Sequence, residues 1–313
     1  MSNIFEALNR GQGEVSDLIL PLIGTESLAK EAAPPAPAVP QPTQIPANTA
    51  AAPRPDPASP APAATVSDPG LCDVRTLPIR IASPSPLLPF DSGHWQASEQ
   101  YRIIRTRIVQ HPQQYRALVV SSAGAGDGKS ITAINIAGVL GLKSQARVLL
   151  VDADLRRSSI HLQLGLPEGP GLAEVLTGAC TLEQALVQIA PFPNLYVLTA
   201  GTSRANPVEL LDNAQWPALC ARFRKLFRYI VFDSPPIAAV ADYDLIQSVC
   251  DGLIMVVRPD HTNRRLCMRA LEAVPKDKMI GVLLNCVKKW FLGKYTTPDY
   301  YYYSDGGRYE TTK

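Results

Sequence analysis

The chain has 313 residues, of which 46% are hydrophobic and 19% are charged, and its formal net charge is +2. These values allow one or two soluble domains with a sizeable core, and they exclude a charge-driven disordered chain or a general polyanion binder. We therefore expect no nucleic-acid partner. Two counts stand out: the chain has 29 prolines, about twice ordinary usage, and six of its 11 tyrosines lie at or beyond Tyr295.

The six cysteines are scattered, without a CxxC pair or a nearby histidine pattern. This spacing indicates neither a zinc site nor a disulfide framework, so we expect reduced thiols in a cytoplasmic protein. No apolar window of about 20 residues occurs, and a membrane-spanning helix is not expected. The early acid Glu6 and the missing basic and apolar regions also argue against a secretory signal.

Residues 1–30 carry apolar positions, among them Ile4, Phe5 and Leu8, that fit one or two short amphipathic helices. These helices either dock on a partner or form an inert leader. Residues 31–90 are rich in Pro and Ala and nearly lack aromatic residues. Such a stretch cannot bury enough apolar area to offset its chain entropy, so we predict an extended, semi-rigid linker.

Residues 91–290 have the pattern of one α/β domain, in which short β-branched runs alternate with helical segments. Continuous apolar strands suit a mostly parallel sheet covered by helices on both faces. Asn206 followed by Pro207 predicts a helix start. The predicted strands are Ala117–Ser121, Arg147–Asp152, Leu195–Thr199, Tyr229–Asp233, Leu253–Val257 and Ile280–Leu284.

A glycine-rich turn between the first of these strands and the predicted helix Thr132–Leu142 indicates a phosphate-binding P-loop. Such a turn aims backbone N–H groups and a helix N-terminus at phosphate oxygens. Lys129 can reach the β- and γ-phosphates of a nucleotide, and the Ser130 hydroxyl can ligate Mg²⁺. Only Ala123 departs from the strict pattern, and an ordinary glycine-rich turn is the alternative. The candidate nucleotide-binding residues here are Gly124, Gly126, Asp127, Gly128, Lys129, Ser130 and Ile131.

Three acids follow predicted strands: Asp152 and Asp154 come after one, and Asp233 after another. In open α/β sheets, ligands bind at the carboxyl ends of the strands, so all three carboxylates are expected to converge on the phosphates. A single acid in such a place is often only a helix cap. Arg156 either stabilises the transferring phosphate or begins a solvated helix.

In this order, the P-loop, the segment Asp-Ala-Asp-Leu-Arg-Arg and the segment Phe-Asp-Ser-Pro-Pro resemble the bacterial tyrosine kinases of capsular and exopolysaccharide synthesis. The helix motif Glu99-x-x-Arg102-x-x-Arg105 and the tyrosine-rich C-terminus strengthen the resemblance, which covers roughly residues 99–309. It implies a P-loop fold that uses ATP and Mg²⁺. It also implies that Asp154 and Asp233 serve the metal with Ser130, and that Asp152 accepts the tyrosine proton, although one acid could do both. For Asn285 it implies a place beside the adenine, with a plain strand-end asparagine as the alternative.

The tyrosines in residues 291–313 neighbour Thr, Pro, Asp, Ser and Gly rather than aliphatic residues, unlike tyrosines that serve a core. We interpret them as phosphoacceptors, with an inert tail as the alternative. The resemblance implies that Glu99, Arg102 and Arg105 form an oligomer interface, supporting a ring in which tails are phosphorylated in trans; a solvated salt-bridged face is the alternative. The candidate phosphoacceptors are Tyr295, Tyr300, Tyr301, Tyr302, Tyr303 and Tyr309.

The sequence thus predicts a cytoplasmic protein-tyrosine autokinase that regulates polysaccharide polymerisation, chain length or export. The resemblance implies a separate membrane-embedded activator that holds the kinase at the inner membrane, and a tyrosine phosphatase as a further partner. Two alternatives share the nucleotide-binding motif: a partitioning ATPase of the ParA/MinD type and a non-catalytic nucleotide-binding scaffold. Partitioning ATPases carry an extra lysine at the place of Gly124 and usually lack a tyrosine cluster, so both features favour the kinase.

Overall fold

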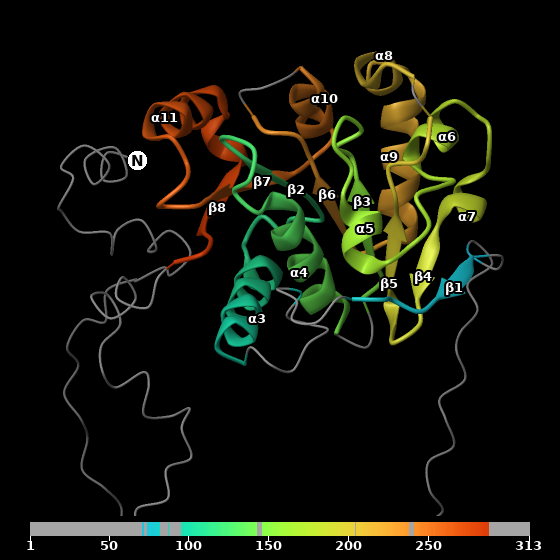
Figure 1. Ribbon diagram of the computed structural model, residues 1–313, viewed down its shortest axis with the longest axis horizontal. Helices are drawn as coiled ribbons and strands as arrows, with labels where there is room; N and C mark the ends of the chain where they lie inside the picture. Colours follow the sequence, from blue (N-terminus) through green and yellow to red (C-terminus); the bar gives the residue numbers. More distant parts are fainter. Residues whose placement is uncertain are drawn as a thin grey trace, which may run out of the picture.

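The computed structural model describes residues 71, 74–81, 87, 95–142, 146–203, 205–237 and 241–287. They form an eight-stranded sheet with helices on both faces (Figure 1). The predicted N-terminal helices and the tyrosine-rich tail lie outside the described residues. Within the described ranges, no helix has the length and apolar character needed to cross a bilayer.

The strand order is β1-β4-β5-β3-β6-β2-β7-β8, and neighbouring strands are parallel except for the antiparallel pair β4 and β5. The six predicted strands are all present, with ends that shift by no more than three residues, and β6 matches to the residue. The predicted mostly parallel α/β fold is therefore confirmed. The six strands are β2 (Ala117–Ser122), β3 (Val148–Asp152), β5 (Phe192–Leu198), β6 (Tyr229–Asp233), β7 (Gly252–Val257) and β8 (Met279–Leu284).

Two further strands were not predicted: β1 (Arg75–Leu77) and β4 (Val187–Ile189). Three residues are too few to show a period of two, so neither strand has a sequence signature. β1 lies within the predicted linker and pairs in parallel with β4, and the side chain of Leu87 is fully buried. The folded part of the chain therefore begins before residue 91, earlier than the predicted boundary.

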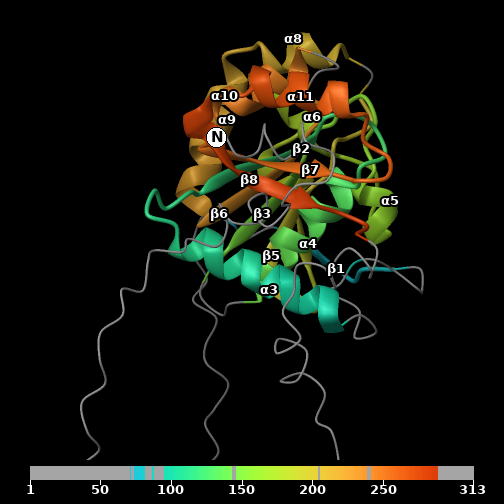
Figure 2. The same cartoon turned by 90° about the vertical axis from the view of Figure 1, so that its left-hand side faces the viewer.

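The strands alternate their side chains between two hydrophobic clusters, one on each face of the sheet. In β2, Leu118 and Val120 face one cluster, whereas Ala117 and Val119 face the other. The first face is covered by α3 (Trp95–Gln110), α4 (Lys129–Gly141) and α5 (Ile160–Leu164). Six helices contribute to the opposite cluster, namely α6 (Leu172–Leu176), α7 (Leu182–Ala185), α8 (Pro207–Leu211), α9 (Gln215–Leu226), α10 (Asp242–Ser248) and α11 (Arg264–Ala273). Figure 2 shows α8, α9, α10 and α11 on the side of the sheet opposite α3. A 3₁₀ helix, Lys276–Lys278, precedes β8.

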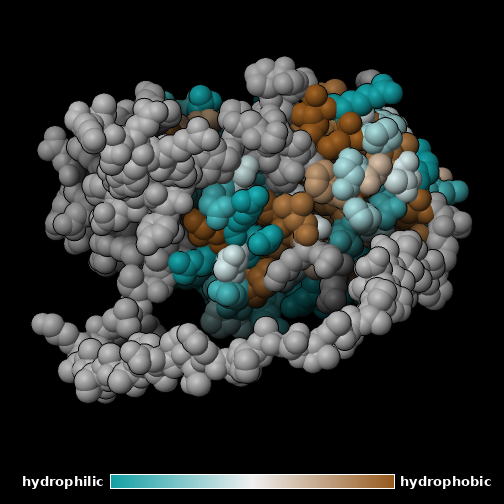
Figure 3. Space-filling view, turned by 90° about the horizontal axis from the view of Figure 1, so that it is seen from below, coloured by the Kyte–Doolittle hydropathy of each residue, from teal (hydrophilic) through white to brown (hydrophobic). Residues whose placement is uncertain are grey.

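Helix α8 begins as predicted. The Asn206 side chain accepts a hydrogen bond from the N–H of Val208, and Pro207 occupies the first helical position. On the surface, the described residues seen from below mix hydrophilic and hydrophobic side chains (Figure 3). The large hydrophobic side chains exposed in the described part are Leu142 and Leu162.

Candidate active site

The glycine-rich turn joins the end of β2 to the start of α4, as the sequence predicts for a P-loop. Gly128 is the residue before α4 and has a φ of 92°, in the left-handed region that favours glycine. A Cβ atom at Gly128 would also collide with the side-chain amide of Asn285. The turn is therefore shaped for glycine at this position, and its backbone lies close to the end of β8.

The P-loop lysine contacts an acid from the segment that follows β3. The Lys129 ammonium lies 2.8 Å from Oδ2 of Asp154, whose other oxygen accepts a hydrogen bond from the N–H of Arg157. Burial disfavours the charged amine, but the carboxylates of Asp233 and Asp154 outweigh that effect and raise the pKa of Lys129. Lys129 is therefore a cation, as binding to phosphate requires.

Asp152 and Asp233 occupy paired positions at the ends of the adjacent strands β3 and β6. Both side chains are fully buried. Burial raises the pKa of each carboxyl; Asp233 adds to the shift at Asp152, and Lys129 opposes the shift at Asp233. Oδ2 of Asp152 accepts hydrogen bonds from the N–H groups of Ser159 and Ile160, which open α5.

Three carboxylate oxygens of this pair, Oδ1 of Asp152 and both oxygens of Asp233, are buried and make no well-formed hydrogen bond in the described part of the chain. The Ser130 hydroxyl lies near enough to Asp233 to oppose the rise of its pKa. Buried acceptors of this kind call for a ligand, an ion or water. Hard oxygen donors suit Mg²⁺, which proteins usually hold with one or two carboxylates and with substrate phosphates. The described residues contain no group of three His, Cys, Asp or Glu side chains that could hold a metal by itself. The donor set thus fits a magnesium ion that arrives with a nucleotide.

Asp127 links the P-loop to the loop that follows β7. Its carboxylate is buried and accepts hydrogen bonds from the Thr262 hydroxyl at 2.7 Å and from the N–H of Gly124 at 3.3 Å. Nδ1 of His261 lies 3.1 Å from the same carboxylate. The Asn285 amide donates to the Asp127 carbonyl at 2.9 Å. The Asp127 side chain therefore faces protein, and it positions the P-loop rather than facing a phosphate.

The sequence did not predict His261 and Thr262 as site residues, because the residues around them look like those of an ordinary loop. It also missed Asp242, the partner of Arg156. The Arg156 guanidinium donates to both carboxylate oxygens of Asp242, at 2.7 and 3.0 Å, and the Asp242 side chain is buried. The Arg156 side chain therefore points toward the start of α10. Arg156 lies in an irregular segment before α5, so the alternative of a helix start does not apply.

The predicted interface residues lie on α3, which packs against α4. Glu99 and Arg102 are exposed and form an ion pair at 2.9 Å, and Arg105, one further turn along, is half-buried. The predicted phosphoacceptor tyrosines lie outside the described residues.

Comparison with known proteins identifies the family. The chain is 37% identical over 208 residues to a tyrosine-protein kinase of Bacillus subtilis, YwqD, with 65% of this chain and 86% of that protein covered. It is 31% identical over 196 residues to the tyrosine-protein kinase CpsD of Streptococcus pneumoniae serotype 4, with coverages of 61% and 84%. The chain belongs to the bacterial tyrosine-protein kinases. No family model matches it.

Solved structures of the family have the same fold. The chimerical protein CapA2B2 superposes with a TM-score of 0.62 at 26% identity, covering 70% of this chain and 96% of that one. The BceF tyrosine kinase domain gives 0.53 at 29% identity, with coverages of 60% and 76%. The predictions of a P-loop fold, of this family and of protein-tyrosine kinase activity are thereby confirmed, and nucleotide use follows from them. A partitioning ATPase and a non-catalytic scaffold are set aside.

Proposed function

We propose that this kinase transfers the γ-phosphoryl group of ATP, in the presence of Mg²⁺, to the tyrosines of residues 295–309 on a neighbouring subunit. One observation carries the proposal: Lys129 and Asp154 meet beside two buried carboxylates at the carboxyl end of the sheet. Phosphoryl transfer needs such positioning and charge neutralisation more than covalent chemistry. The tyrosine cluster supplies acceptors within the same chain.

In the proposed reaction, Lys129 and the P-loop N–H groups bind the phosphates. The tyrosine oxygen bonds to the γ-phosphorus as the bond between that phosphorus and the ADP oxygen breaks. The phenolic proton passes to Oδ1 of Asp152, the oxygen that has no hydrogen-bond partner among the described residues. Ser130, Asp154 and Asp233 would hold Mg²⁺, which neutralises charge on the phosphates when bound. Asn285, through its contact with the P-loop, borders the nucleotide.

The ion-paired face of α3, with Glu99, Arg102 and Arg105, is the proposed contact between subunits of a ring. Each phosphotyrosine adds about −1.5 to −2 charges, so several on one tail would repel the acidic site and loosen the ring. A tyrosine phosphatase would reset this cycle, which we assign to the control of exopolysaccharide polymerisation, chain length or export.

We place the kinase in the cytoplasm, held at the inner membrane by a separate membrane-embedded activator. Residues 1–30 are the candidate docking segment and residues 31–90 carry the linker, now shortened by the folded residues around β1.

Lys129→Ala tests the proposed chemistry, and Lys225→Ala, which removes an exposed lysine of α9, is the matched control. With ATP and Mg²⁺, and with the membrane activator co-expressed, anti-phosphotyrosine signal is expected from the wild type and from Lys225→Ala. It is expected to vanish in Lys129→Ala. ATP hydrolysis without phosphotyrosine under these conditions would overturn the proposal.

A further inference from the structure

Residues 74–81 form a strap that ties the predicted linker to two parts of the domain. The strand within the strap, β1, pairs in parallel with β4 at the edge of the sheet (Figure 1). The Leu77 carbonyl accepts a hydrogen bond at 2.9 Å from the N–H of Ala190, just past β4. Further along the strap, the N–H of Arg80 donates at 2.9 Å to the carbonyl of Leu164, the last residue of α5. The strap therefore connects the sheet edge to α5.

The strap lies directly against the end of α5. Gly165, the residue after α5, has a φ of +63°, in the left-handed region that favours glycine. A Cβ atom at Gly165 would lie 2.6 Å from the carbonyl oxygen of Arg80 and 2.7 Å from its Cβ atom, which is closer than such atoms approach. On either side of Arg80, the side chains of Ile79 and Ile81 pack against the same hydrophobic cluster as the buried side chains of α5. The strap and α5 are therefore fitted to each other.

The other end of α5 fixes the carboxylate of Asp152. Oδ2 of Asp152 accepts hydrogen bonds from the N–H groups of Ser159 and Ile160, each at 3.1 Å, where α5 begins. These bonds orient the carboxylate and leave Oδ1 without a hydrogen-bond partner among the described residues. α5 has only five residues. A helix of that length spans about 7.5 Å, so a shift at its last residue also moves the N–H groups at its start.

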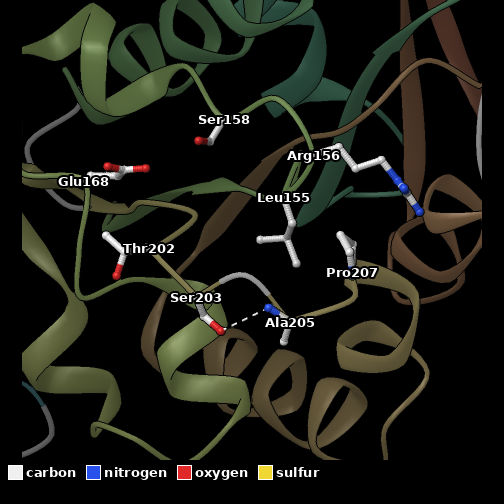
Figure 4. Close-up of a pocket in the computed structure, with 9 residues that line it drawn as sticks. Leu155, Arg156, Ser158, Glu168, Thr202, Ser203, Ala205 and Pro207 are labelled. Atoms are coloured by element: carbon white, nitrogen blue, oxygen red, sulfur yellow. Dashed lines mark hydrogen bonds between the residues drawn. The ribbon is translucent and has the colours of Figure 1, made fainter.

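The segments on both sides of α5 border the candidate active site. Ser158 lies just before α5 and Glu168 shortly after it, and both line a cavity of about 570 Å³ (Figure 4). Leu155, which directly follows Asp154, lines the same cavity. A displaced α5 would therefore change the surroundings of the site as well as the carboxylate of Asp152.

We infer that the strap is a positioning element for Asp152 and that it acts through α5. The inference rests on the proposed function, in which Asp152 accepts the phenolic proton. A proton acceptor must lie within hydrogen-bond reach of its donor, and a displacement of about 1 Å can lower a rate on the order of 10²-fold. The predicted linker leads into the strap, so the N-terminal part of the chain joins the domain one short helix away from this carboxylate.

Gly165→Ala tests the contact, because the added Cβ atom would push α5 and the strap apart. Gly178→Ala is the matched control: Gly178 also has a positive φ, +74°, but a Cβ atom there would meet no atom of the described residues within 4 Å. Full-length chains phosphorylate a tagged Lys129→Ala acceptor chain with the activator present. The limiting rate is expected to fall about tenfold in Gly165→Ala and to stay within twofold of the wild type in Gly178→Ala. The ATP concentration for half-maximal rate is expected to change less than twofold in both.

Hydrogen exchange gives a readout that does not require catalysis. Mass spectrometry of the peptide that contains Ser159 and Ile160 reports whether their N–H groups stay bonded to Asp152. Exchange at this peptide is expected to be on the order of tenfold faster in Gly165→Ala than in the wild type, and unchanged in Gly178→Ala.

A second variant acts from the strap side and replaces Gly165→Ala if that protein does not fold. Ile79→Ala combined with Ile81→Ala removes the apolar side chains that anchor the strap, and the same fall in the limiting rate is expected. Arg80→Ala is the control for this variant, because the Arg80 side chain is exposed and its bond to α5 comes from the backbone. Its limiting rate is expected to stay within twofold of the wild type.

A limiting rate in Gly165→Ala within twofold of that in Gly178→Ala would overturn the inference and leave the kinase activity itself intact. An equal loss of ATP affinity would also overturn it, because the strap would then support the whole site rather than Asp152. If the wild type forms no phosphotyrosine while Gly165→Ala still exchanges faster at Ser159 and Ile160, the proposed reaction fails and the link between the strap and Asp152 stands.

Discussion

The Lys129 ammonium and the Asp154 carboxylate lie 2.8 Å apart where the P-loop meets the end of β3. Only 14% of the lysine side chain and 3% of the aspartate side chain are exposed, so solvent screens this pair far less than a surface ion pair. The pair holds the cation at the proposed phosphate site. It therefore orients the P-loop lysine before the nucleotide arrives.

Asp154→Asn is expected to slow tyrosine phosphorylation on the order of 10²-fold, because it removes the charge that orients Lys129 and one proposed metal ligand. Initial rates of phosphotyrosine formation at saturating ATP measure this effect. Asp212→Asn, at the exposed end of α8, serves as control and should leave the rate unchanged. A rate for Asp154→Asn within twofold of the wild type would contradict the assigned role.

Thr262→Val is expected to weaken ATP binding about fivefold, because it removes the 2.7 Å hydrogen bond between the loop after β7 and the buried carboxylate of Asp127. Asp127→Ala removes the contacts with both His261 and Thr262 and should weaken ATP binding further. Titration with a fluorescent ATP analogue measures both. Asp277→Ala changes an exposed acid in the 3₁₀ helix before β8, and this protein should bind ATP as the wild type does. Equal affinity in all four proteins would show that this connection does not position the P-loop.

Arg156→Ala is expected to lower the free energy of unfolding by roughly 1–3 kcal/mol, because it leaves the buried carboxylate of Asp242 without its bidentate donor. Urea unfolding of each protein gives this value. The neighbouring change Arg157→Ala, at an exposed side chain, should stay within about 0.5 kcal/mol. Equal stability of the two variants would contradict a structural role for the Arg156–Asp242 pair.

Leu87→Ala is expected to destabilise the fold by roughly 2–5 kcal/mol, because the side chain of Leu87 is fully buried in the cluster under α3 and α4. The result decides whether the folded part of the chain begins before residue 91. Thermal or urea unfolding is the measurement. Leu162→Ala, at a side chain that is 71% exposed, is the matched control. A Leu87→Ala protein as stable as the Leu162→Ala control would show that Leu87 belongs to the linker.

The strands that could be predicted from the sequence are those with an unbroken run of buried apolar residues. β6 is apolar from Tyr229 to Phe232 and ends at an acid, and both of its ends were predicted to the residue. β1 and β4 could not be predicted, because their three residues form strands only through pairing with each other and, for β4, with β5.

The same contrast holds for the site. Asp152 and Asp233 could be placed because parallel strands bring their carboxyl ends to one edge. The partner of Arg156 lies 86 positions later, and that of Asp127 lies 135 positions later. Contacts between loops that are distant in the sequence cannot be predicted from local sequence patterns.

Phosphorylation between subunits can be tested directly. A donor chain with its six late tyrosines changed to Phe is co-expressed with a Lys129→Ala acceptor chain and the membrane activator, and the acceptor is examined by mass spectrometry. We expect phosphotyrosine within residues 295–309 of the acceptor. An acceptor without phosphate in that segment, beside a wild-type chain that phosphorylates itself under the same conditions, would contradict it.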